Sequence, residues 1–238
     1  MHRIRAVTLD LDDTLWAIDP VIRRAEERLW AWLTEHFPKI PENYPAEAML
    51  TIREEVVDEY WHKNHDFRFL RKKVLERVAT SVGYDVSMVE PAFAVFDAAR
   101  NDVELFPDVL PNLELLARSL RIVAVTNGNA NLEIIGIRHL FHDVVTAVGA
   151  GAAKPARRIF EEAVDRAGVA PQQVLHVGDH PETDVAGARE AGLRAAWINR
   201  KGDDWPDHLE SPEAVVTSMT ELHRLLGPAM AASADEQD

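Results

Sequence analysis

Seven polar residues, grouped at four places along the chain, have side chains that together could transfer a phosphoryl group. They are Asp10 with Asp12, Thr126 with Asn127, Lys154, and Asp179 with Asp184. Carboxylates can act as nucleophiles, as general acids and bases, and as ligands of hard cations. Hydroxyl, amide and ammonium groups can bind phosphate oxygens. Because a bare carboxylate cluster would repel a phosphate dianion, this combination implies help from a divalent cation.

The two acids of the first group have different predicted roles. Asp10 would attack phosphorus and form an acyl phosphate, which divides one difficult displacement into two easier ones. Asp12 would protonate the leaving group and then activate water, a contribution typically worth about 10² to 10⁴ in rate. Mg²⁺ is the predicted cation, with Asp10 and Asp179 as ligands and water completing an octahedron.

Each polar group lies at the end of a predicted strand or in the loop that follows it. The strands are short, β-prone apolar runs, at residues 5–9, 121–126, 141–148, 173–179 and 193–199. In an open parallel sheet, active sites lie at the carboxyl ends of the strands, so we expect the polar groups to converge. There, Thr126, the backbone N–H of Asn127 and Lys154 would bind the phosphate.

Two regions of the chain differ in their periodicity. After residue 106, helices alternate with the strands, which predicts parallel βαβ units with right-handed crossovers. Residues 17–105 instead carry apolar side chains at three- and four-residue intervals, as amphipathic helices do. We therefore predict an α/β fold, with a Rossmann-like parallel sheet core (1–16 and 106–227) and an inserted all-helical cap domain (17–105). The tail, 228–238, is predicted to be disordered.

The overall composition limits the classes of function. A net charge of −14 argues against non-specific binding to nucleic acid. No apolar run reaches the roughly 20 residues that span a bilayer, there is no cysteine, and no secretory signal is evident. We therefore expect a cytoplasmic enzyme, monomeric or homodimeric, whose partner is a small phosphorylated metabolite rather than a nucleic acid or a membrane.

The motifs around these residues resemble the four ordered motifs of the haloacid dehalogenase (HAD) superfamily. They are DxDxT from Asp10, Thr-Asn-Gly from Thr126, Lys-Pro from Lys154, and GDxxxxD from Gly178 to Asp184. The helical insertion resembles the α-helical C1-type cap of that family. The resemblance implies that Asp10 is the nucleophile and Asp12 the acid and base. It also implies a catalytic, phosphate-binding Lys154, and two further metal ligands in the backbone carbonyl of Asp12 and Asp184, the latter directly or through water.

A finer resemblance concerns the substrate. The stretches DLDDTLW, AVTNGNANLEIIGI and LHVGDHPETDVAGAREAGLRAAWI are similar to bacterial HAD phosphatases of riboflavin metabolism. This similarity implies FMN or 5-amino-6-ribitylaminouracil phosphate as substrate. Trp16, Arg68 and His180 are the candidate contacts with the rest of such a substrate. Ala17 and Ile18 depart from the polar residues expected after the aromatic Trp16.

Other functions remain open on the same scaffold. A haloacid dehalogenase would use the same aspartate to attack carbon, but it would have no use for Asp12 or for the full set of metal ligands. A phosphomutase would share all four motifs, and a non-catalytic HAD-scaffold regulator would have lost one of them. Simpler structural roles are also available: Asp13 is expected to be a structural cap, His176 a core residue, and Lys154 could be a solvated loop residue.

Overall fold

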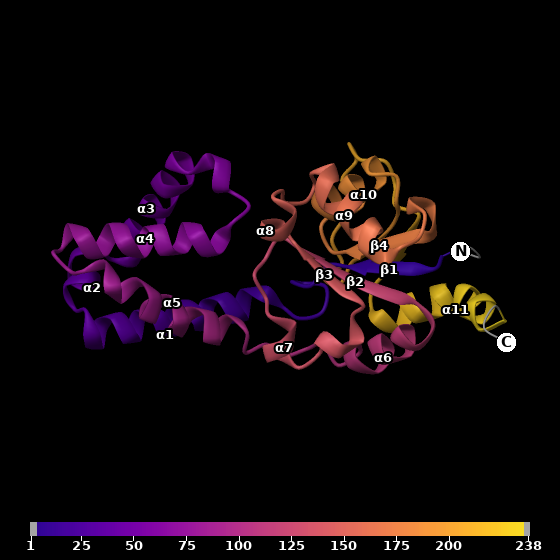
Figure 1. The fold of residues 1–238 in the computed structure, drawn as a ribbon, viewed down its shortest axis with the longest axis horizontal. Coiled ribbons are helices and arrows are strands. Elements are labelled where there is room, and N and C mark those ends of the chain that lie inside the picture. The colour runs from indigo at the N-terminus through magenta and orange to yellow at the C-terminus, as the bar shows by residue number, and fades with distance from the viewer. Residues whose placement is uncertain (1–3, 236–238) are drawn as a thin grey trace. The chain divides into compact units, whose positions relative to one another are not determined.

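The chain forms two compact units in a computed structural model that describes residues 4–235 (Figure 1). The sheet unit comprises the described residues of Met1–Ala17, Glu104–Gly128 and Leu132–Asp238. The helical unit comprises Ile18–Val103 and Asn129–Asn131. Each unit has its own buried hydrophobic core. That the helical unit acts as a cap stays a prediction.

A six-stranded parallel sheet forms the centre of the sheet unit, in the order β3-β2-β1-β4-β5-β6. The strands are β1 (Ala6–Leu9), β2 (Arg121–Thr126), β3 (Asp143–Thr146), β4 (Val174–Gly178), β5 (Arg194–Ile198) and β6 (Ala214–Val216). The predicted Rossmann-like parallel sheet is thereby confirmed. The short edge strand β6 was not predicted, because its three residues carry too little pattern to stand out.

The strand order brings the ends of β1, β2 and β4 together. Leu9 pairs with Ala124 of β2 on one side and with Val177 of β4 on the other. All four residues of β1 are buried, as expected for a central strand covered on both faces. The chain adds β2 and β3 on one side of β1 and later β4, β5 and β6 on the other. Ligands of such sheets bind at the carboxyl ends of the strands, where the order reverses.

Helices cover both faces of the sheet, with α9 and α10 on one face and α6 and α11 on the other (Figure 1). The helices of this unit are α6 (Val109–Ser119), α7 (Leu132–Ile135), α8 (Ala147–Ala150), α9 (Arg157–Ala167), α10 (Gly187–Glu190) and α11 (Met219–Asp235). A π-helical turn, η5 (Pro181–Ala186), precedes α10, and short 3-10 turns occur at η3 (Arg138–Leu140) and η4 (Pro171–Gln173). In α9, Ile159, Phe160 and Ala163 are fully buried in the core, which explains how this helix is held on the sheet.

The C-terminal segment differs from the prediction. A disordered tail was expected from residue 228, but α11 continues through Pro228 to Asp235, and residues 236–238 lie outside the described residues. Leu226 and Ala229 are buried, so tertiary packing stabilises the helix across the proline. The alanine and methionine residues that suggested a small, featureless tail are also good helix formers.

The helical unit is a bundle of amphipathic helices, as the periodicity predicted. Its helices are α1 (Ile18–His36), α2 (Lys39–Asn43), α3 (Ala46–Glu59), α4 (Phe67–Ser81) and α5 (Val89–Arg100), with 3-10 turns η1 (Trp61–Lys63) and η2 (Val86–Met88). Helix α1 buries Val21, Ala25, Leu29 and Leu33, one residue per turn. Helix α4 begins where the side chain of Asp66 accepts a hydrogen bond from the backbone N–H of Phe69.

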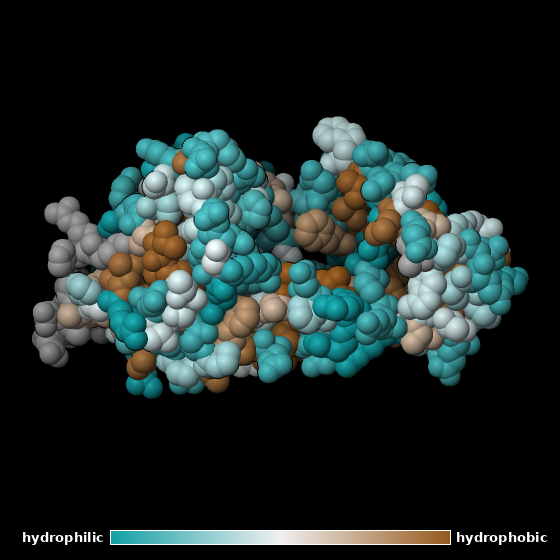
Figure 2. Space-filling view, turned by 180° about the vertical axis from the view of Figure 1, so that it is seen from behind, coloured by the Kyte–Doolittle hydropathy of each residue, from teal (hydrophilic) through white to brown (hydrophobic). Residues whose placement is uncertain are grey.

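The polarity of the surface and of the helices was compared with what a membrane-spanning helix requires. Hydrophilic residues make up most of the face in Figure 2, with apolar residues exposed between them. Between residues 4 and 235, no helix is both long and apolar enough to cross a membrane.

Candidate active site

The residues predicted to do chemistry meet where β1 and β4 end. Asp10 follows β1 directly, and its backbone N–H donates to the carbonyl oxygen of Val177 at 2.9 Å, which extends the sheet pairing by one residue. Carboxylate oxygens of Asp10, Asp179 and Asp184 lie within 4.8 Å of one another, and we call these three residues the acid cluster. The topology therefore joins groups that are about 170 positions apart in the sequence.

Lys154 bridges two residues of the acid cluster. Its Nζ donates to Asp10 Oδ1 at 2.5 Å and to Asp184 Oδ1 at 2.6 Å. The Lys154 side chain is 3% exposed, so a solvated loop lysine is the wrong interpretation. Its backbone is fixed by Asn127, whose Oδ1 accepts from Lys154 N at 2.7 Å and whose Nδ2 donates to Lys154 O at 3.0 Å. This side-chain role of Asn127 was not predicted.

Asp184 is held from several directions. Its Oδ1 also contacts His176 Nε2 at 3.1 Å, and its Oδ2 accepts from the backbone N–H of His180 at 3.0 Å. The other ring nitrogen of His176 lies 2.9 Å from Thr8 Oγ1, and both Thr8 and His176 are fully buried. His176 is thus a satisfied core residue, as predicted, but it also orients an acid of the cluster. Its position two residues before Gly178, facing the same side of β4 as that residue, was the available signal.

Gly178 makes the close packing of Asp184 possible. A Cβ atom at this position would lie 2.3 Å from Asp184 Cγ and 2.6 Å from Asp184 Oδ2. Any larger residue would therefore displace the carboxylate. The glycine of the GDxxxxD motif is therefore needed for space, because the side chain of Asp184, the last residue of the motif, occupies that side of β4.

Burial and mutual repulsion shift the titration of the cluster. Burial raises the pKa of Asp10 well above its ordinary value, opposed by Lys154 and reinforced by the neighbouring Asp184. Burial, together with the charges of Asp184 and Asp13, raises the pKa of Asp179 to about 6. Burial works against the charge of Lys154, but Asp10 and Asp184 outweigh it and raise the pKa of the lysine. Lys154 and His176 likewise outweigh burial and hold the pKa of Asp184 well below its ordinary value.

The acid cluster fits a divalent hard cation. With all groups ionised, three carboxylates and one ammonium leave an excess of two negative charges, which the raised pKa of Asp179 also reflects. The donor atoms are all oxygen, the donor type that Mg²⁺ prefers. Asp10, Asp179 and Asp184 would hold the ion, and Asp12 would add its backbone carbonyl.

Asp12 is oriented by a neighbouring aromatic residue. Its Oδ1 accepts a hydrogen bond from Trp16 Nε1 at 2.9 Å. Trp16 was predicted to touch the substrate, but its side chain is fully buried, so in this structure it contacts Asp12 instead. Asp13 has a left-handed backbone with φ of 57° and pairs with Lys201 Nζ at 2.8 Å, in keeping with a structural role.

The remaining predicted contacts have local partners. The Thr126 hydroxyl accepts from Gly128 N at 2.9 Å and keeps its own hydrogen as a donor. The ring of the exposed His180 accepts from the backbone N–H groups of Glu182 and Thr183, so this side chain caps η5. In the helical unit, Arg68 pairs with Asp97 at 3.1 Å and lies over the ring of Phe93. Substrate contacts by His180 and Arg68 stay predictions.

Similar proteins include several phosphatases. The 5-amino-6-(5-phospho-D-ribitylamino)uracil phosphatase YigB of Escherichia coli (strain K12) is 29% identical over 234 residues, covering 95% of this chain and 98% of that protein. The glyceraldehyde 3-phosphate phosphatase of Methanopyrus kandleri is 30% identical, covering 92% of this chain and 98% of its own.

Solved structures that are similar to this chain include both a dehalogenase and a phosphatase. A 2-haloacid dehalogenase from Pseudomonas syringae pv. Tomato DC3000 superimposes with a TM-score of 0.88 and 38% identity, over 94% of this chain and 98% of the other. A HAD phosphatase from Thermococcus onnurineus superimposes with a TM-score of 0.69 and 25% identity, over 94% and 99%. The model of the haloacid dehalogenase-like hydrolase family matches residues 4–192 of this chain. Since that match spans most of the chain, this protein belongs to the haloacid dehalogenase-like hydrolase family.

Proposed function

We propose that this protein is a phosphomonoester hydrolase that works with Mg²⁺ through an aspartyl-phosphate on Asp10. The observation that carries this proposal is the convergence of Asp10, Lys154, Asp179 and Asp184 in one buried cluster. Named phosphatases of similar length support it. A bound Mg²⁺ would offset the negative charge of the cluster and of the phosphate.

The side chains supply the two chemical steps. An oxygen of Asp10 attacks phosphorus, the bond from phosphorus to the ester oxygen breaks, and Asp12 gives its proton to the leaving oxygen. Asp12 then takes a proton from a water molecule, which attacks the same phosphorus and releases phosphate and the Asp10 carboxylate. Trp16 positions Asp12 for both proton transfers through its indole N–H. Lys154 and the Thr126 hydroxyl bind phosphate oxygens.

Dehalogenation is the second candidate, because a structure titled 2-haloacid dehalogenase has 38% identity and a TM-score of 0.88. In that reaction the carboxylate attacks carbon and halide leaves without a proton. Dehalogenation therefore gives no function to the oriented Asp12 carboxylate or to the acid cluster. The observed Trp16–Asp12 hydrogen bond and the acid cluster therefore favour phosphate over halide.

The substrate is proposed to be a small phosphorylated metabolite, with 5-amino-6-ribitylaminouracil phosphate and FMN as first candidates. The Escherichia coli relative named for the former, matched over 95% of this chain, supports this choice. Glyceraldehyde 3-phosphate is a comparison substrate, because a second relative is named for it. A place in riboflavin metabolism, a cytoplasmic location and a monomeric or dimeric state stay predictions.

A parallel assay of phosphate and halide release tests the proposal. The purified protein is incubated with Mg²⁺ and a panel containing the three phosphorylated metabolites, p-nitrophenyl phosphate and 2-chloropropionate. We expect phosphate release from at least one ester and no chloride release. D10N should abolish the phosphate signal, which excludes a contaminating phosphatase. Chloride release without phosphate release would instead establish the dehalogenase.

A further inference from the structure

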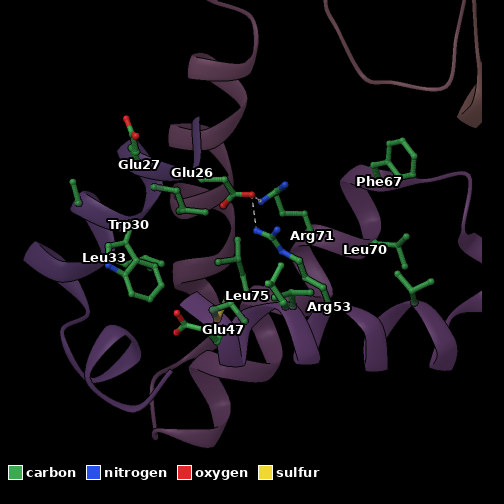
Figure 3. Close-up of a pocket in the computed structure, with 16 residues that line it drawn as sticks. Glu26, Glu27, Trp30, Leu33, Glu47, Arg53, Phe67, Leu70, Arg71 and Leu75 are labelled. Carbon is green, nitrogen blue, oxygen red and sulfur yellow. Dashed lines mark hydrogen bonds and ion pairs between the residues drawn. The ribbon is translucent and has the colours of Figure 1, made fainter. Parts of the chain in front are cut away.

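The helical unit contains a cavity of about 730 Å³ in which all the lining residues lie between Glu26 and Leu75 (Figure 3). This volume lies within the range of pockets that bind small molecules. The walls come from α1, α3 and α4 and are mostly apolar; they include Leu29, Trp30, Leu50, Val57, Phe67 and Leu70. Leu50, Val57 and Phe67 are each more than 40% exposed, so apolar surface is open to an occupant.

A group of three charges interrupts these apolar walls. Glu26 Oε1 accepts hydrogen bonds from Arg53 Nη2 at 2.5 Å and from Arg71 Nη1 at 2.8 Å. Figure 3 shows the two guanidinium groups converging on the one carboxylate, from different helices. Two cations on one anion leave an excess of one positive charge. We call this cavity the arginine pocket.

Arg71 is held in place before any ligand arrives. Its guanidinium lies over the ring of Phe96, with Cζ 3.5 Å from the ring centroid, and its side chain is 19% exposed. Burial, opposed by Glu26 and reinforced by the charge of Arg53, lowers the pKa of Arg71. The positive charge is therefore poorly solvated, and a fixed, under-solvated guanidinium favours an anionic group beside it.

Two other acids restrict the charge of that anion. Glu27 and Glu47 also line the cavity, and among the described residues neither forms an ion pair with Arg53 or Arg71. Both are exposed, and Glu27 points away from the guanidinium groups in Figure 3. Water screens them, but they disfavour a ligand with two or more negative charges. A single charge suits the pocket best.

We propose that the arginine pocket binds an amphipathic monocarboxylate, with the carboxylate at Arg53 and Arg71 and an aliphatic or aromatic body against the apolar walls. The concave shape and the volume fit a small molecule rather than a helix of a second copy. A second copy would also have to bring an acid into the cavity to balance the guanidinium pair. This site is independent of the proposed phosphatase chemistry, since none of its residues belongs to the acid cluster.

Calorimetric titration with three ten-carbon probes tests the charge requirement on the full-length protein. Decanoate, decanol and decylammonium share an apolar body and differ in charge. We expect decanoate to bind about tenfold more tightly than the other two, because only its carboxylate can accept charge-assisted hydrogen bonds from the guanidinium groups. Similar affinities for all three probes, or no detectable binding of decanoate, would overturn the proposal.

Paired variants on α4 test the position of the site. R71Q should weaken decanoate binding about tenfold or more, through loss of one such bond. R77Q is the matched control, because Arg77 lies on the same helix as Arg71 and pairs with Glu55 and Glu59 of α3 but does not line the pocket. An equal loss in both variants contradicts the assignment.

A second variant with the opposite expected effect keeps the test valid if R71Q misfolds. E26Q keeps the shape and the acceptor oxygen but removes the negative charge, so decanoate should bind more tightly than to the parent. Weaker binding to a folded E26Q protein would overturn the proposal. Sedimentation analysis provides a further check: a dimer that R71Q dissociates, with no effect of decanoate, would show that a second copy fills the pocket.

Discussion

The acid cluster of the sheet unit and the arginine pocket of the helical unit are both incomplete charge networks, of opposite sign. The three carboxylates of the acid cluster and Lys154 together carry two negative charges in excess, whereas the group of Glu26, Arg53 and Arg71 in the arginine pocket carries one positive charge in excess. Uncompensated charge that is partly withdrawn from water favours a counter-charge, so the sign of each excess predicts the charge of its ligand. We therefore expect a cation at the acid cluster and an anion in the arginine pocket.

The two sites also differ in how they are built. In the acid cluster, Asp10 and Asp179 directly follow β1 and β4, and Asp184 lies in the turn η5 shortly after β4. The groups of the arginine pocket extend from helix faces on long side chains, with fractional exposures of 19% to 37%. We therefore expect substitutions in the acid cluster to have larger and more specific effects.

The largest expected effect is that of D10N. The amide keeps the shape of Asp10 but cannot form the acyl phosphate, so turnover should fall by roughly 10⁴-fold or more, as for other covalent nucleophiles. Hydrolysis of p-nitrophenyl phosphate measures the loss, and circular dichroism checks the fold. Substantial remaining activity in a pure preparation would remove Asp10 from the nucleophile role.

The second prediction concerns Asp12 and its aromatic partner. D12N should lower turnover by about 10² to 10⁴, the usual contribution of general acid–base catalysis. W16F removes the indole N–H that orients Asp12, together with part of a buried ring, and the loss of one hydrogen bond of about 1 kcal/mol corresponds to a loss of roughly fivefold in turnover. Turnover numbers for the two variants test the order. An effect of W16F as large as that of D12N would show that Trp16 does more than position the acid.

The third prediction links the charge of the acid cluster to pH. The folded-state pKa of Asp179 is raised from 3.8 to about 6, so its effect on stability favours folding at low pH and is lost as pH rises through about 6. Mg²⁺ replaces the proton, and at 100 times its Kd it should stabilise the fold by about 2.7 kcal/mol. The rise in melting temperature with Mg²⁺ should therefore be larger at about pH 7.5 than at about pH 5.

A matched variant separates the acid cluster from other acids in this experiment. D179N should lose most of the Mg²⁺-dependent stabilisation at either pH. A parent protein whose melting temperature does not respond to Mg²⁺ would refute the proposed cation site, whatever its activity.

The last prediction concerns the role of His176. H176N removes the ring nitrogen that contacts Asp184 and should weaken Mg²⁺ binding by about tenfold, the lower end of the range for groups that orient metal ligands. Calorimetric titration with Mg²⁺ measures this directly, without reference to turnover. H208N is the control, because His208 is exposed and pairs with Glu182. Equal affinity in both variants would make His176 a packing residue only.

From the sequence alone we could predict the parallel sheet, the helical insertion and the residues of the acid cluster. The carboxyl ends of the strands of an open parallel sheet lie at the same edge, so residues that follow such strands can be predicted to lie close together. The continuation of α11 past Pro228 was missed, because packing of Leu226 and Ala229 decides it rather than local propensity.

The contacts that each side chain makes depend on tertiary packing and could not be predicted in the same way. Trp16 is buried against Asp12, and the side chain of Asn127 fixes the backbone of Lys154. His176 contacts Asp184, which packs closely against β4 because Gly178 has no side chain. The arginine pocket was equally invisible, since Arg53 and Arg71 each occur in an ordinary amphipathic pattern. Side-chain direction and the spacing between helices bring them to Glu26, and neither quantity is encoded in any short stretch of sequence.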